Sequence, residues 1–210
     1  MGYFCLVLLC VCRYICKMHF LFSGGKIMSK KMNTRKLTTM AIMIAVSVVL
    51  VYFIHIPIFP QVSFLEYDPA DISILICGFA FGPLAGICVT VVASLIQGLT
   101  VSAHSELYGI LMHIIATGAL VLVSSLVYRK HKSKGGAAIA LVCGVMAMVI
   151  VMIPTNLFIT PFFMGVPRQM VIDLLGFIVA FNAIKAGLNA ILTFVLYKSV
   201  SKLLKHLDVK

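Results

Sequence analysis

The chain has 210 residues, of which 62% are hydrophobic and only 11% are charged, and its mean hydropathy is +1.13. A water-soluble domain carries about a quarter charged residues and roughly half apolar ones, so the composition excludes a soluble globular protein and indicates one that sits in a lipid bilayer. The formal net charge of +11 follows from the membrane topology described below, and we expect no nucleic-acid partner.

Residues 1–27 fit this picture poorly. Their apolar run is interrupted by Arg13 and Lys17, and they have neither the basic start nor the small-residue cleavage site of a signal peptide. The sequence MSKKMNTRKL from Met28 is a natural start beside a membrane, with Met32 as a second possible start. We therefore expect the chain to start at Met28 or Met32, with 1–27 an N-terminal extension that is a gene-start artefact and 28–210 the membrane domain. An interfacial helix is the alternative for 1–27.

Apolar runs that resemble membrane helices follow in order. About 20 residues are needed to cross roughly 30 Å of hydrocarbon, and the runs lie at 38–57, 71–99, 106–128, 137–158 and 173–198. The second is too long for one helix, and FGPLAG at 81–86 breaks it into 71–81 and 83–99, with Asp71 placed to stabilise the first helix start. We predict an all-α integral membrane protein with six transmembrane helices in a compact bundle, since no barrel-like alternation is present.

The charged residues support six crossings. Three basic clusters precede the first predicted helix, follow the fourth and end the chain: Lys30, Lys31, Arg35 and Lys36; Arg129, Lys130, Lys132 and Lys134; and Lys198, Lys202, Lys205 and Lys210. Six crossings place all three on one side, which the positive-inside rule makes cytoplasmic. Both termini are then cytoplasmic in a multi-pass protein of the cell membrane. The opposite side carries one basic residue, Arg168, and the acidic residues Glu66, Asp68, Asp71, Glu106 and Asp173.

The sequence contains no Walker A phosphate loop, no HExxH pair and no GxSxG elbow. Uphill transport by this chain would need an ion gradient or partner subunits. The cysteines lack paired CxxC spacing, so we expect no metal site, and those within helices are interpreted as packing residues. We interpret His113 as a hydrogen-bonded histidine inside the bundle rather than a ligand.

The last predicted helix carries Asn182, Lys185 and Asn189, whose i, i+3, i+7 spacing puts them on one face. Lys185 lies roughly 18 Å along a helix that starts near Asp173, and a lysine at the membrane centre costs about 3 kcal/mol. An inward-facing ammonium between amides suits a ligand rich in acceptors. The alternative is a buried pair with a protein carboxylate, which we disfavour because the acidic residues are expected near the outer helix ends.

The segments FLEYDPADI, FGPLAGI, AMVIVMIPTN and FNAIKAG occur in this order. Over residues 35–203 the chain resembles the riboflavin-specific substrate-binding (S) components of energy-coupling factor (ECF) transporters. The resemblance implies a six-helix membrane subunit that captures riboflavin from outside and docks on one transmembrane coupling protein and two cytosolic ATPases. Riboflavin is then the transported substrate, and no resident cofactor is expected.

The resemblance also implies binding residues. The FNxIK motif places flavin-binding groups at Asn182 and Lys185, and the motif of the preceding helix places another at Asn156. The loop PIFPQVSFLEYDP resembles the lid of the family, whose Phe64, Leu65 and Tyr67 are expected to cover the ring system.

Two further sequence features bear on the site. Gln97 is a further candidate for binding, with solvation of a helix end as the alternative. Pro154 is expected to unwind its helix and to free backbone groups for the ligand.

Ala41 and Ala45 are small residues four positions apart, a spacing that lets helices approach closely in lipid. In the family such a motif meets the coupling protein, so we assign both alanines to that interface; ordinary packing inside the bundle is the alternative.

Two rival functions stay open. One is an S component for another vitamin, for example pantothenate or folate, whose carboxylate would also explain Lys185. The other is a small intramembrane enzyme or scaffold, which would need a nucleophile or paired carboxylates in the core.

Overall fold

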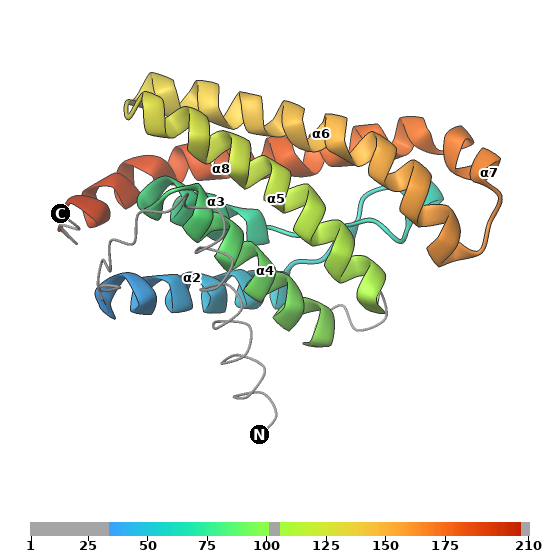
Figure 1. The fold of residues 1–210 in the computed structure, drawn as a ribbon, viewed down its shortest axis with the longest axis horizontal. Helices are drawn as coiled ribbons and strands as arrows, with labels where there is room; N and C mark the ends of the chain where they lie inside the picture. The colour runs from blue at the N-terminus through green and yellow to red at the C-terminus, as the bar shows by residue number, and fades with distance from the viewer. Residues whose placement is uncertain (1–33, 101–105, 207–210) are drawn as a thin grey trace, which may run out of the picture.

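The computed structural model describes residues 34–100 and 106–206 (Figure 1). The expectations for 1–27, Met28 and Met32 lie outside these residues. The helices of the described part are α2 (Thr34–Phe53), α3 (Ala70–Phe81), α4 (Pro83–Thr100), α5 (Glu106–Lys130), α6 (Lys134–Met164), α7 (Arg168–Asp173) and α8 (Leu175–His206). Between α2 and α3 the strands β1 (Ile56–Pro57) and β2 (Glu66–Tyr67) pair antiparallel around the 3-10 turn η1 (Pro60–Val62). We call residues 54–69 the lid segment.

The predicted all-α membrane fold is confirmed. Among the described residues, α2, α4, α5, α6 and α8 are long and apolar enough to cross a membrane, whereas α3 has 12 residues. At 1.5 Å per residue α3 is about 18 Å long, so it is shorter than the hydrocarbon layer. The predicted boundary near residue 57 was wrong: α2 ends at Phe53, because the residue before Pro57 disfavours helical backbone. The six-residue helix α7 was not predicted.

The two ends of the bundle differ in charge. Figure 1 shows the start of α2, the α5–α6 connection and the end of α8 at one end, and α7 with the lid segment at the other. Among the described residues, the first end carries Arg35 and Lys36 at the start of α2 and Arg129, Lys130 and Lys134 around the α5–α6 connection. The second end carries Glu66 of the lid segment and Asp173 of α7. The described basic residues of these segments are therefore grouped at one end of the bundle, as expected from the sequence.

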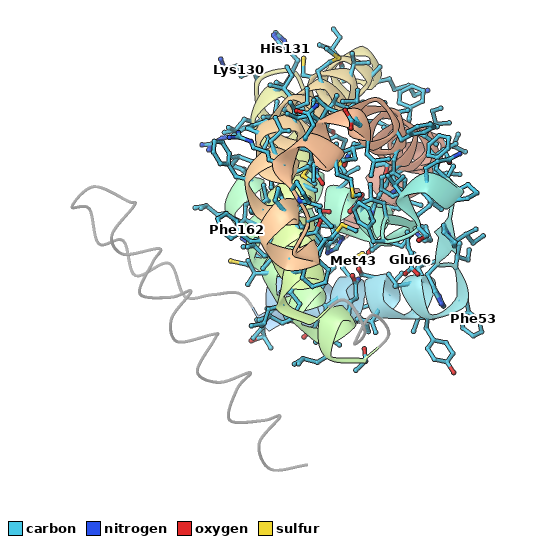
Figure 2. The ribbon with its side chains drawn as sticks, turned by 90° about the vertical axis from the view of Figure 1, so that its right-hand side faces the viewer. Met43, Phe53, Glu66, Lys130, His131 and Phe162 are labelled. Carbon is cyan, nitrogen blue, oxygen red and sulfur yellow. The ribbon has the colours of Figure 1, made fainter. Side chains whose placement is uncertain are left out.

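The outer surface of the bundle is apolar. Phe53 and Phe162 point away from the helices (Figure 2), and their side chains are 77% and 89% exposed. Large exposed apolar side chains on most helices are expected where lipid rather than water surrounds the protein. The interior packs around a buried cluster that includes Leu75, Leu120 and Met148.

The α3–α4 turn confirms the interpretation of FGPLAG. Gly82 has φ +92°, a backbone conformation that favours glycine, and its N–H donates to the Gly78 carbonyl at 2.9 Å. One turn into α4, a Cβ on Gly86 would clash with the Val121 side chain and lie 3.1 Å from the Gly78 Cα. The short helix α3 is therefore folded tightly against α4 and α5.

The expected unwinding at Pro154 was wrong, since α6 continues through Pro154 and on to Met164. Polar side chains next to the proline donate to carbonyls of the preceding turn. Thr155 Oγ1 donates to the Val151 carbonyl at 2.7 Å, and Asn156 Nδ2 donates to the Met152 carbonyl at 2.8 Å. The helix thus keeps its path through the proline, which membrane helices tolerate.

Candidate functional site

A cavity of about 110 Å³ lies between the lid segment and the inner faces of the helices. The lid segment contributes His55, Phe64, Leu65, Glu66 and Asp68 to its wall. The rest of the lining comes from α2, α4, α5, α6 and α8, and includes Val51, Ser94, Gln97, Tyr108, Met112, His113, Met148, Met152, Phe181, Asn182 and Lys185. The lining combines apolar side chains with polar and charged ones, so it can contact both an apolar ring system and polar groups of a small molecule.

The polar face of α8 is buried, as predicted. Asn182, Lys185 and Asn189 are only 2%, 7% and 0% exposed. Asn182 and Lys185 line the cavity, whereas Asn189 lies behind it against the lid segment. Asn182 Nδ2 donates to the Ile178 carbonyl at 2.8 Å, so its second N–H and its carbonyl oxygen have bonding capacity left for a ligand.

The expectation that no protein carboxylate meets Lys185 was wrong. Lys185 Nζ lies 2.6 Å from Asp68 Oδ2 and donates a hydrogen bond to it. Asp68 reaches this depth because the lid segment folds inward before α3 begins. The same carboxyl accepts a hydrogen bond from the Ala70 N–H at 3.1 Å. The acidic residues were expected near the outer helix ends on the assumption that every helix starts at the membrane surface.

Asn189 ties the lid segment to α8 and α3. Its Oδ1 accepts a hydrogen bond from the Tyr67 hydroxyl at 3.1 Å, and its Nδ2 donates to the Asp68 carbonyl and to Asp71 Oδ2, each at 3.0 Å. Tyr67, expected to cover a ligand, is therefore engaged with Asn189 and is absent from the cavity wall.

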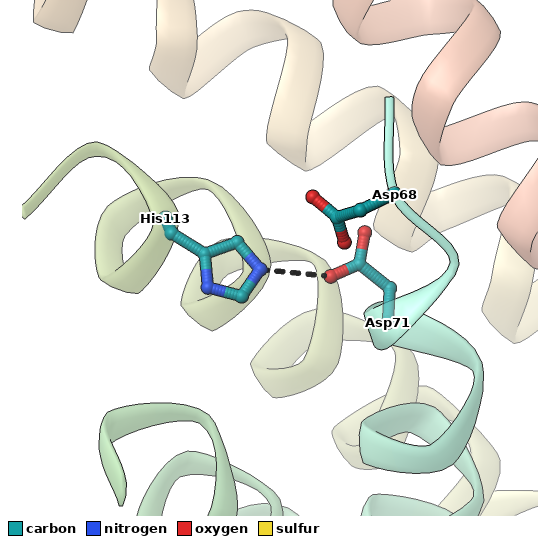
Figure 3. Close-up of side chains that lie close together, drawn as sticks. All are labelled: Asp68, Asp71 and His113. Atoms are coloured by element: carbon teal, nitrogen blue, oxygen red, sulfur yellow. Dashed lines mark ion pairs between the residues drawn. The ribbon is translucent and has the colours of Figure 1, made fainter. Parts of the chain in front are cut away.

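Asp71 is a second buried carboxylate near the cavity, beside Asp68. Its side chain is fully buried, where the sequence analysis had expected it near an outer helix end. It accepts a hydrogen bond from Thr117 Oγ1 at 2.6 Å and lies 3.5 Å from His113 Nε2 (Figure 3). On its other nitrogen, His113 Nδ1 lies 2.8 Å from Ser94 Oγ. The interpretation of His113 as a hydrogen-bonded histidine of the bundle is confirmed, and it also lines the cavity.

Asp68, Asp71 and His113 bring one ligand-type atom each to within 4.8 Å of one another (Figure 3). This grouping was missed in the sequence, although the carboxylates three positions apart in DPAD were a visible signal. Lys185 supplies positive charge beside Asp68, while Thr117 and Asn189 both donate to Asp71. The protein thus satisfies these carboxylates with its own donors.

Two further expected residues differ in their distance from the cavity. Gln97 is 5% exposed, lines the cavity and donates from Nε2 to Ser47 Oγ at 2.9 Å, so its interpretation as a solvated helix end was wrong. Asn156 is fully buried but does not line the cavity. Its Oδ1 accepts from Thr160 Oγ1 at 3.1 Å, and Thr160 in turn lies 2.9 Å from the hydroxyl of Tyr108, which does line it.

Ala41 and Ala45 lie on the exposed face of α2. The alternative of packing inside the bundle was therefore wrong. Only 11% of the most apolar stretch of α2 is buried, compared with 39–44% in the other four long apolar helices. Within the described residues, α2 is thus the long helix with the most surface available for a partner or lipid.

Comparisons with known proteins point to one family. The family model described as "ECF transporter, substrate-specific component" matches residues 35–197. The chain is 26% identical over 192 residues to the riboflavin transporter RibU of Staphylococcus aureus, covering 88% of this chain and 100% of the relative. It is 30% identical over 125 residues to RibU of Streptococcus thermophilus, covering 59% of each chain.

A solved structure agrees with these sequences. The fold matches a structure described as the S component of a bacterial ECF transporter with a TM-score of 0.73 and 27% identity, covering 82% of this chain and 98% of the other. Helix arrangement and sequence therefore lead to the same family.

Proposed function

Because the chain belongs to the family of substrate-specific components of ECF transporters, we propose that it is the subunit that captures riboflavin for import across the bacterial cell membrane. Support for the vitamin comes from two relatives that are riboflavin transporters. Support from the chain itself comes from a cavity whose lining combines Lys185 and Asn182 with apolar side chains such as Phe64 and Met148.

The chemistry of this cavity carries the proposal. The uracil-like edge of riboflavin has carbonyl and N–H groups that pair with the carboxamides of Asn182 and Gln97. The ammonium of Lys185 has N–H donors beyond the one given to Asp68, and these suit ribityl hydroxyls or ring nitrogens. Phe64 and Met148 supply apolar contact for the fused rings.

The size of the cavity implies movement of the lid segment. Small-molecule sites typically measure roughly 300–1,000 Å³, and the present cavity measures about 110 Å³. Phe64 and Leu65 line the cavity from the lid segment, which connects two helices and is not itself part of a long helix. We therefore expect the lid segment to move outward when riboflavin binds, with Phe64 and Leu65 then covering the ring system.

The orientation follows from the charged ends of the bundle. With α3 and the inward-folded lid segment counted as one crossing, the chain crosses the membrane six times. The end with the three basic clusters is then cytoplasmic, and so are both termini. The lid segment and the cavity lie toward the opposite, extracellular end, which suits capture of a vitamin from outside.

Energy and docking are assigned to partners. The chain is a binding subunit without an ATPase site of its own and without a resident cofactor. One transmembrane coupling protein and two cytosolic ATPases complete the transporter. The exposed Ala41 and Ala45 on α2 let a helix of the coupling protein approach closely.

The buried carboxylates do not favour an intramembrane enzyme. The sequence analysis required paired carboxylates in the core for that function, and Asp68 and Asp71 do lie there. Each of them, however, accepts hydrogen bonds from donors of the protein, including Lys185 and Thr117. These hydrogen bonds engage the carboxylate oxygens of Asp68 and Asp71 in contacts within the protein, which favours a structural role over a catalytic one.

Titration of the purified full-length chain with riboflavin tests the proposed function. We expect saturable quenching of riboflavin fluorescence at one vitamin per chain. Pantothenate and a folate serve as competitors, because a carboxylate vitamin is the rival substrate. Displacement of riboflavin by either one, or no quenching of riboflavin at all, would contradict the assignment.

A further inference from the structure

The positive charge inside the cavity already has a partner. Lys185 lines the cavity, and its ammonium is hydrogen-bonded to Asp68 at 2.6 Å. The two side chains are 8% and 13% exposed, so both charges are largely removed from water. The electrostatic attraction between two opposite charges is much stronger in a buried site than at a solvent-exposed surface.

Lys185 supplies the one lysine or arginine charge among the described residues of the cavity wall, and that charge is already matched by Asp68. The other titratable groups of the wall are the carboxylate of Glu66, the imidazoles of His55 and His113 and the phenol of Tyr108. Directly behind the wall, Asp71 adds another carboxylate 3.5 Å from His113. A ligand that brings its own negative charge meets an unfavourable field here.

We propose that Asp68 is a specificity-determining residue: by matching the charge of Lys185, it makes the cavity select uncharged ligands over ligands that carry a phosphate or carboxylate. The inference rests on the proposed function, since it assigns a property to the same cavity. It also predicts that a carboxylate vitamin, the rival substrate considered above, is a poor ligand.

The selection has a simple physical basis. A neutral acceptor such as a hydroxyl or ring nitrogen needs only one of the two remaining N–H donors of Lys185. An anion would either share the ammonium with Asp68 or displace it. Sharing places two negative charges side by side, and displacement leaves the Asp68 carboxylate buried without its cation.

Binding of riboflavin and of riboflavin 5′-phosphate to the wild-type chain and to Asp68→Asn tests this. We expect the wild type to bind the phosphate at least about tenfold more weakly, and Asp68→Asn to reduce that ratio by at least about tenfold. Asp173→Asn is the matched control, because it removes an equal charge from an exposed position outside the cavity and leaves the ratio unchanged.

Each result decides the inference. An unchanged ratio in Asp68→Asn, with both ligands weakened alike, would show that Asp68 only holds the lid segment. The wild type alone gives a second test with an uncharged 5′ ester of riboflavin: stronger binding of this ester than of the phosphate supports charge selection, and equal binding overturns it. A wild type that binds no riboflavin removes the proposed function and this inference together, whereas riboflavin binding with an unchanged ratio removes the inference alone.

Discussion

Lys185 of α8 donates a hydrogen bond to Asp68 of the lid segment at 2.6 Å, although the two residues are 117 positions apart in the chain. The contact joins the buried polar face of α8 to the lid segment, which forms part of the cavity wall. The Asp68 carboxylate balances the positive charge of Lys185, which would be energetically costly if it were unpaired in the membrane interior. The contact also couples any change at Lys185 to the position of the lid segment.

Replacement of Lys185 by methionine separates these two roles. Lys185→Met leaves the Asp68 carboxylate buried without a cation, so we expect a loss of about 3–5 kcal/mol in stability and weaker riboflavin binding by about 1–3 kcal/mol. The double variant Asp68→Asn with Lys185→Met removes both charges and should regain much of the stability but not the affinity. Thermal unfolding in detergent and riboflavin titration measure the two quantities; full affinity in Lys185→Met would contradict the assigned role.

Asn182 and Asn156 are distinguished by their distance from the cavity. Asn182 lines it and Asn156 does not, so Asn182→Ala should weaken riboflavin binding by about 1–3 kcal/mol and Asn156→Ala by clearly less. The exposed Gln169→Ala is a control for loss of a carboxamide. Fluorescence titration ranks the three variants, and a larger effect at Asn156 than at Asn182 would mean that the ligand lies elsewhere.

Tyr67 fastens the lid segment through its hydroxyl. Tyr67→Phe removes the hydrogen bond to Asn189, and we expect a loss of about 1 kcal/mol in stability together with faster riboflavin dissociation. Stopped-flow fluorescence measures the dissociation rate. Tyr52→Phe removes a hydroxyl from a side chain that is 67% exposed and should leave the rate unchanged. Equal rates in the wild type and Tyr67→Phe would show that this bond does not hold the lid segment.

Local sequence patterns predicted much of the fold. The apolar runs located the long helices, FGPLAG located the α3–α4 turn at Gly82, and the spacing of Asn182, Lys185 and Asn189 predicted one buried face. These features depend on neighbouring residues along one helix or turn, which is the range over which hydropathy and backbone preferences act.

The contacts between distant segments were not predicted. Hydropathy gives no measure of how deep a connecting segment folds into a bundle, so the Lys185–Asp68 pair and the burial of Asp71 were missed. Pro154 was misjudged because a single proline does not by itself end a membrane helix, and α6 continues to Met164. The helix α7 has only six residues, too few for a periodic pattern to appear.

Docking on the coupling protein is tested at Ala41. Ala41→Trp places a large side chain on the exposed face of α2, so riboflavin uptake by cells that contain the complete transporter should be lost while binding to the purified chain is kept. Ile139→Trp changes a residue of α6 that is 62% exposed and should affect neither measurement. Normal uptake by Ala41→Trp would remove the α2 face from the docking interface.

The central claim is that riboflavin occupies the cavity between the lid segment and α8. A structure of the chain with riboflavin bound tests it most directly. The account predicts the ring system beneath Phe64 and Leu65, with Asn182 and Lys185 at hydrogen-bond distance from the ligand and Asp68 still beside the ammonium. Riboflavin bound at another place, or a ligand whose polar groups contact neither Asn182 nor Lys185, would contradict it.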